Sequence, residues 1–124
     1  MTESNEIMKI ELSSDYCVSI VEEDDGQHVY YNCKEYQIGQ FEPIEQKIYI
    51  YSNMANGLKW RTLAHELAHA FLFVVGLQNS QMNEESICDF ISIYHEKITE
   101  IVNEYKEMAG KYYANKNRDK AIHR

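Results

Sequence analysis

Residues 61–71 read Arg-Thr-Leu-Ala-His-Glu-Leu-Ala-His-Ala-Phe, and this stretch decides both the fold and the chemistry of the chain. His65 and His69 are four residues apart, so a helix places their side chains on one face, about one turn apart. Two imidazoles at this spacing can bind one metal ion, and Glu66 is placed to reach a metal-bound water. The stretch therefore predicts a helix that carries a metal site.

The helix around this motif is expected to run over residues 58–75 and to end at Gly76, a residue type that favours helix ends. Its apolar residues and alanines leave almost no polar face, which is typical of a helix buried on several sides. Burying His65, Glu66 and His69 in such a helix costs free energy unless the three side chains have partners. These surroundings favour a metal site over a chance arrangement of polar residues.

A second helix is expected to begin near Asn83, an N-cap residue type, and to run to about residue 112. At this length it would reach about 45 Å, more than a domain of this size covers. Two interpretations stay open: the far part packs against a partner helix or a second copy of the chain, or the helix folds back over its own sheet with a kink near Gly110. The homodimer would use a heptad stripe over residues 87–112, formed by Ile87, Ile91, Tyr94, Ile98, Ile101, Tyr105, Met108 and Tyr112.

Strand patterns fill the first half of the chain. Alternating apolar residues predict strands over 7–12 and 16–21, a tyrosine-rich stretch predicts a third over 28–36, and residues 39–43 break it. Residues 47–51, Lys-Ile-Tyr-Ile-Tyr, are the clearest strand because of their β-branched and aromatic content. We therefore expect an α+β fold, with a small, mainly antiparallel N-terminal sheet packed on the central motif helix and on a second long helix.

Length and charge bound the domain and its partners. The 124 residues fit one domain, which we expect to be compact over 1–114, with a basic, frayed tail over 115–124. The net charge of −8 argues against a nucleic-acid partner, because attraction to phosphates needs a basic field. No apolar run is long enough to span a membrane, and the polar N-terminus does not resemble a secretory signal. Three cysteines without a C-x-x-C pair fit reduced thiols in the cytoplasm.

A catalytic zinc site usually has three protein ligands and an open fourth position, so a third ligand is needed. The nearest acids lie at the start of the second helix, where Glu85 and Asp89 are again four residues apart. Glu85 can bind the metal, and Asp89 can accept the N–H of a ligating imidazole and hold its orientation. Glu84 is the nearest alternative ligand and His95 a more distant one. Cys88 could also approach the metal, although a small buried thiol is the simpler interpretation.

This pair of motifs resembles the gluzincin arrangement of zinc metallopeptidases, in which thermolysin is the familiar member. Residues 65–69, His-Glu-Leu-Ala-His, match its first motif, and residues 85–89, Glu-Ser-Ile-Cys-Asp, match its second. A metzincin would have glycine and histidine where this chain has Leu72 and Val75. Among compact members, residues 38–95 look most like small ImmA/IrrE-type metallopeptidases and related proteins of phages and mobile elements.

The resemblance implies one zinc ion per chain and a protein or peptide as the substrate. The implied ligands are His65, His69 and Glu85, with Asp89 orienting a ligand. Glu66 would take a proton from the zinc-bound water and deliver it to the leaving amine.

The resemblance also implies a binding place for the substrate. In gluzincin-like folds the strand before the motif helix is a sheet edge that pairs with an extended peptide, which would make Ile48, Tyr49 and Ile50 substrate-binding residues. A donor to the oxyanion is expected too, and Tyr49, Tyr51 and Tyr94 are candidates among the ten tyrosines.

Three functions from different classes fit these observations. The leading one is a zinc-dependent metalloendopeptidase-like hydrolase that cleaves a peptide bond in a specific protein target. The second is a non-catalytic, zinc-stabilised regulatory or interaction protein that uses the long C-terminal helix. The third is a metal-free interaction protein built on the heptad stripe. An intact Glu66 favours catalysis, because a purely structural zinc site does not need it.

Overall fold

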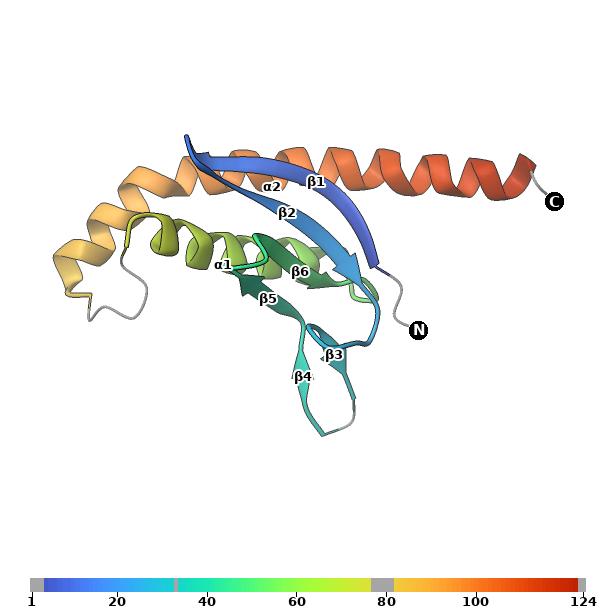
Figure 1. The fold of residues 1–124 in the computed structure, drawn as a ribbon, viewed down its shortest axis with the longest axis horizontal. Helices are drawn as coiled ribbons and strands as arrows, with labels where there is room; N and C mark the ends of the chain where they lie inside the picture. The colour runs from blue at the N-terminus through green and yellow to red at the C-terminus, as the bar shows by residue number, and fades with distance from the viewer. Residues whose placement is uncertain (1–3, 33, 77–81, 123–124) are drawn as a thin grey trace.

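The computed structural model describes residues 4–32, 34–76 and 82–122. In these ranges six strands are followed by two helices (Figure 1). The elements are β1 (Ser4–Ser13), β2 (Tyr16–Glu23), β3 (Tyr30–Tyr31), β4 (Tyr36–Gln37), β5 (Gly39–Glu42), β6 (Lys47–Tyr51), α1 (Asn56–Val74) and α2 (Glu84–Ile122). The expected α+β class, with a mainly antiparallel sheet ahead of two helices, is confirmed.

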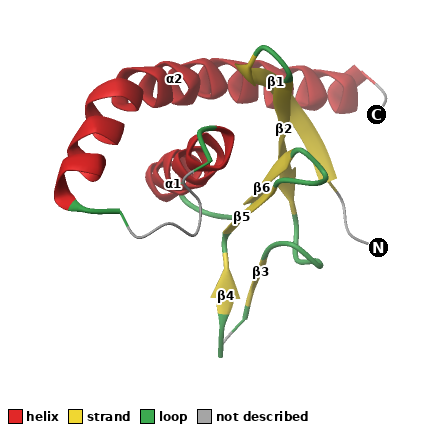
Figure 2. Ribbon diagram, turned by 60° about the vertical axis from the view of Figure 1, so that its left-hand side comes forward, coloured by secondary structure: helices red, strands yellow, loops and turns green. Residues whose placement is uncertain are grey.

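Four strands form one sheet in the order β1-β2-β6-β5, and β3 and β4 form a separate two-stranded hairpin. β1 and β2 are antiparallel, as are β5 and β6, whereas β2 and β6 run parallel. The hairpin projects from the β5 side of the sheet, away from both helices (Figures 1 and 2).

β5 lies where the sequence predicts only a break, and the single strand expected over 28–36 is wrong. Asn32 turns the chain inside that range, since its Oδ1 accepts the backbone N–H groups of Lys34 and Glu35 at 2.9 Å. Gly39 and Pro43 bound β5 rather than exclude a strand, because proline is tolerated just beyond the end of an edge strand.

The expectation that β6 forms an edge of the sheet is also wrong. β6 lies between β2 and β5, so both sides of its backbone are already hydrogen-bonded. The side chains of Ile48, Tyr49 and Ile50 are buried. An extended peptide therefore cannot add to this strand, and the outer position falls to β5.

Two apolar cores lie on opposite faces of the sheet. The larger one joins the sheet to both helices, and Ile48 and Ile50 of β6 pack there with residues of α1 such as Leu67. The smaller one contains Tyr49 and Tyr51, the alternate residues of the same strand. α1 packs against β5, β6, β1 and α2, and so lies at the centre of the molecule (Figure 2).

α1 ends as the sequence predicts, because Gly76 follows it with a φ of 77°. The helix is buried on several sides, as expected, but it does carry a polar face. Arg61, His65 and His69, spaced four residues apart, are all exposed and form a polar strip along one face. Of the three polar side chains of the motif, only Glu66 is buried, so the two histidines do not pay the free-energy cost of burial.

α2 begins as expected, with the Asn83 side chain accepting the backbone N–H of Ser86 at 2.8 Å. It then continues for 39 residues, or about 58 Å. The helix continues through Ile122, across the range 115–122 in which a frayed tail is expected. Figure 2 shows that α2 curves near its beginning and runs nearly straight over the rest of its length, without the kink that was expected near Gly110.

The heptad stripe of α2 packs within the chain over residues 94–112, whereas its first two members do not. Ile101 and Tyr105 are buried in the larger core, whereas Ile87 and Ile91 are 44% and 56% exposed. The stripe thus joins α2 to its own sheet, and its apolar beginning remains open to a partner. No helix in the described ranges is both long and apolar enough to cross a membrane.

A buried glutamate holds the three layers together. Glu22 of β2 is fully buried, and its Oε1 pairs with Nζ of Lys59 on α1 at 3.0 Å. Tyr113 of α2 donates to the same oxygen at 2.9 Å, and the Tyr105 hydroxyl donates to Oε2. Burial and the Glu22 charge raise the pKa of both tyrosines, so both hydroxyls stay protonated as donors.

Removing the Glu22 carboxylate should destabilise the fold strongly. Glu22→Ala leaves the buried Lys59 ammonium and two hydroxyls without an acceptor, and we expect a loss of about 3–5 kcal/mol. The double variant Glu22→Leu with Lys59→Met removes both charges and should regain part of the loss, because the two tyrosine hydroxyls still lack their acceptor. Urea unfolding measures both, with the exposed Glu11→Ala as control. A Glu22→Ala loss no larger than that of the control would contradict this role.

Candidate metal centre

His65 and His69 converge on the exposed face of α1. Their Nε2 atoms lie 3.2 Å apart, and the two rings meet edge to face with centroids 4.8 Å apart. Two nitrogens bound to one zinc ion at about 2.05 Å and a tetrahedral angle would be about 3.3 Å apart. The pair therefore has the separation that a shared metal ion requires. A neutral N–H···N hydrogen bond has a similar length, so the distance alone does not identify a metal site.

Glu66 lies between the helix and the sheet and is only 8% exposed. Burial raises the pKa of its carboxyl group, while His69, His65 and a hydrogen bond from the backbone of Phe41 act in the opposite direction. Because the inner side of β5 is paired with β6, this hydrogen bond places Glu66 at the outer edge of β5.

The contact between β5 and α1 depends on a glycine. A Cβ atom on Gly39 would lie 2.6 Å from Cγ2 of Thr62 and 3.1 Å from Cγ and Oε2 of Glu66. Thr62 cannot yield easily, because its Oγ1 donates to the carbonyl of Leu58 at 2.8 Å. Only glycine lets the backbone of β5 lie directly against Glu66.

Two hollows meet at this contact. One, of about 320 Å³, is lined by His65 and Arg61 among others. The other, of about 370 Å³, is lined by His69 together with apolar residues such as Phe41, Phe73 and Pro43. Both hollows share Gln37, Gly39 and Glu66. Together they form one groove between α1 and the segment 36–43, with the motif at its centre.

The structure does not bring a third metal ligand to this pair. Within the described parts of the chain, no three His, Cys, Asp or Glu side chains are grouped so that they could hold a metal ion. Glu85 and Asp89 are exposed on the first turns of α2. At about 100° per residue, Glu85 lies about 180° around the helix from Tyr94, which packs on the core. Glu85 as a ligand, with Asp89 behind it, stays a prediction.

A different face of α2 looks toward His65. A groove of about 440 Å³ between the two helices is lined by His65 from α1 and by Tyr94 and His95 from α2. Glu84 lies within about 20° of His95 around the helix, so it shares this face. The two alternative ligands named from the sequence, Glu84 and His95, therefore lie on the same face of α2. Cys88, expected to be a buried thiol, is exposed.

The three candidate oxyanion donors lie on different sides of the sheet. Tyr49 and Tyr51 belong to the smaller core, on the face of the sheet away from α1. The Tyr49 hydroxyl donates to Glu45 at 3.0 Å, and its ring stacks on His28. Of the three candidates, only Tyr94 lines a hollow together with a motif histidine.

Sequence reasoning missed the residues that build the groove opposite α1. Gln37, Gly39 and Phe41 come from a stretch whose glycine and proline suggest a loop. Gly39 could have predicted this contact, because an isolated glycine in an extended stretch often marks a close approach of the backbone.

Comparison of the chain with protein-family models, with curated proteins and with solved structures finds no match in any of the three.

Proposed function

We propose that this protein is a zinc-dependent, gluzincin-like peptidase that cleaves a peptide bond in a specific protein target. The observation that carries the proposal is the arrangement at the centre of the groove. Two imidazole nitrogens lie 3.2 Å apart at the surface, and a buried carboxylate lies beside them at an open strand edge. His65 and His69 would hold the ion, with Glu85 as the third ligand and Asp89 behind it.

The residues of the chain divide the chemistry among them. When bound, zinc supplies Lewis acidity that polarises a carbonyl and makes water more acidic. Glu66 accepts the proton of the attacking water and passes it to the leaving amine. Its burial favours the neutral acid, which helps it to return the proton.

The outer edge of β5 would hold the substrate. Within the described residues β5 pairs with no strand other than β6. Glu66 already bonds to the Phe41 backbone at the outer edge, so an extended peptide would pair with the remaining backbone groups there. This edge meets α1 at Glu66 and therefore aligns a peptide with the histidine pair. The substrate-binding role that the sequence assigns to β6 passes to its neighbour.

A second function has an observation of its own. The first turns of α2 expose Ile87, Ile91 and Ile93, which favours a partner protein or a second copy of the chain. A non-catalytic, zinc-stabilised interaction protein would use this surface. A cytoplasmic location belongs to the proposal, because the described cysteines, Cys17 and Cys88, are free thiols. Cys33 lies outside the described residues.

Glu66→Gln should abolish peptide cleavage while the protein keeps its zinc. The amide cannot accept the proton of water, and we expect a rate loss of about 10²-fold or more. The substrate is a pool of amine-acetylated tryptic peptides from total cell protein, with new N-termini counted by mass spectrometry. Exposed Glu104→Gln is the matched control. Cleavage by Glu66→Gln at the parent rate would overturn the mechanism.

The third ligand can be assigned from zinc content by plasma mass spectrometry. We expect Glu85→Ala to lose zinc and Glu84→Ala to keep it, because only Glu85 has an acid four residues on. Zinc binding would then have to turn the first turns of α2 by about 100° relative to this structure. The opposite result would assign the ligand to the face that Glu84 shares with His95.

Gly39→Ala should reduce cleavage without removing zinc. The added methyl group pushes β5 away from Thr62 and Glu66, so the peptide is displaced from the histidine pair. A misplacement of about 1 Å can cost about 10²-fold in rate. Gly57→Ala is the control, since a Cβ there meets nothing within 4 Å. Equal rates for the two variants would show that this contact does not position the substrate.

A further inference from the structure

The groove between α1 and the segment 36–43 continues beyond His65 into a third hollow. This hollow has a volume of about 490 Å³ and shares Tyr36, Ile38 and Leu58 with the hollow at His65. Its full lining is Tyr31, Tyr36, Ile38, Tyr51, Asn53, Met54 and Leu58. The groove therefore runs without a break from the motif to the β3–β4 hairpin.

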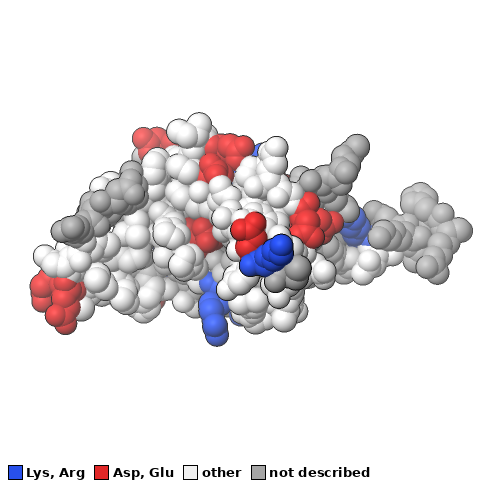
Figure 3. Space-filling model, turned by 90° about the horizontal axis from the view of Figure 1, so that it is seen from below, with Lys and Arg blue, Asp and Glu red and all other residues white. Residues whose placement is uncertain are grey.

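The lining of this third hollow carries no charged side chain, although the chain has a net charge of −8. Tyr31 and Tyr36 face each other across the hairpin with ring centroids 5.8 Å apart, and both are more than 60% exposed. Seen from below, the side toward which the hairpin points, most of the surface is uncharged (Figure 3). Exposed, paired tyrosines around an uncharged hollow fit a large apolar or aromatic side chain.

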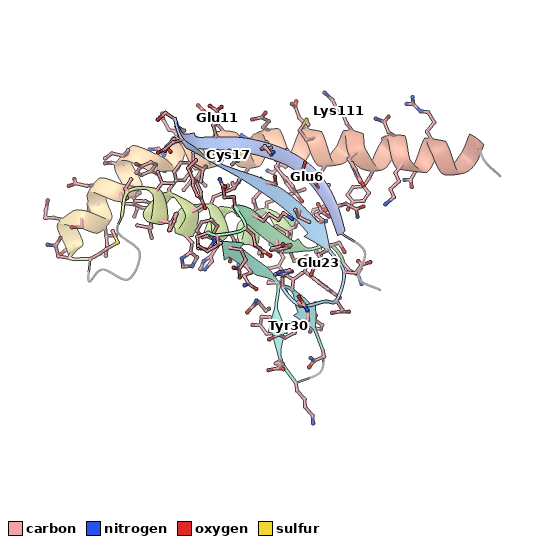
Figure 4. The ribbon with its side chains drawn as sticks, viewed as in Figure 1. Glu6, Glu11, Cys17, Glu23, Tyr30 and Lys111 are labelled. Carbon is pink, nitrogen blue, oxygen red and sulfur yellow. The ribbon has the colours of Figure 1, made fainter. Side chains whose placement is uncertain are left out.

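The hairpin wall is held in place by the sheet. His28, just before β3, stacks on Tyr49 at 3.7 Å and contacts Glu23 at 3.3 Å through Nδ1. Figure 4 shows Glu23 at the end of β2 and Tyr30 on the hairpin. Gln37 Nε2 donates to the carbonyl of His28 at 2.6 Å, and the backbone N–H of Tyr31 donates to Asp25 at 2.8 Å. The hollow is therefore preformed.

We propose that this hollow binds a large apolar or aromatic side chain of the peptide substrate, about three residues from the bond that is cleaved. The distance follows from α1, where Leu58 precedes His65 by about 10 Å of helix. An extended peptide covers this length in about three residues. The inference rests on the proposed peptidase function and adds the substrate class: extended segments with an apolar side chain at a fixed offset from the cleavage point.

Profiling with the same peptide pool tests the subsite. The zinc-loaded parent should cleave peptides enriched in Phe, Tyr, Trp, Leu or Met at the second to fourth residue on one side of the bond. Tyr31→Ala removes one wall and should reduce the cleavage of these peptides about tenfold. Tyr31→Phe should retain it, and Ile44→Ala, an exposed apolar residue outside the hollows, is the matched control.

A second variant tests the polarity of the hollow without changing its size. Asn53→Asp places a carboxylate in the lining and should lower the same enrichment, with zinc content unchanged. Cleavage without a preference at these positions, or a preference that Tyr31→Ala leaves intact, would overturn the subsite but not the peptidase. No cleavage above a Glu66→Gln blank would overturn the peptidase function and the subsite with it.

Discussion

The structure depends on the charge of Glu22, buried where β2, α1 and α2 meet. A carboxylate without solvent is tolerated only with several donors, and Lys59, Tyr105 and Tyr113 supply them from two helices. Lys59 fixes α1 against the sheet, and the two tyrosines fix α2. Apolar packing alone would leave the helices free to slide or rotate, whereas the directional bonds to one carboxylate select a single arrangement.

This arrangement decides which face of α1 meets water. Lys59 anchors the start of the helix, and Leu63, Leu67 and Phe71 then turn into the core. The polar strip of Arg61, His65 and His69 must therefore be exposed. Glu66 lies beside this strip, where α1 meets β5. The catalytic geometry proposed for the groove is in this sense a consequence of core packing, and the close approach at Gly39 completes it.

Much of the fold could be predicted from local signals. The Asn83 cap and the Gly76 helix end depend on a few neighbouring atoms, so the sequence shows them directly. The inner position of β6 could not be predicted in this way, because it depends on β5 pairing from the other side. The burial of Lys59 could not be predicted either, because its partner Glu22 lies 37 residues away in the sequence. The histidine pair followed from helical spacing, whereas the third ligand depends on the rotation of α2, which no local pattern determines.

The two halves of α2 differ in what holds them, and this difference bears on the missing third ligand. Tyr105 and Tyr113 tie the second half to Glu22, so moving it would break buried hydrogen bonds. Among the described residues, the first turns have no buried hydrogen bond of this kind: Glu84, Glu85 and Ile87 are exposed, and packing on the core begins at Phe90. Segments with few buried contacts rearrange at low free-energy cost. Zinc ligation of the proposed kind, whose free energy is large compared with such a cost, would therefore draw an α2 carboxylate to the histidine pair without moving the half of α2 that Glu22 holds.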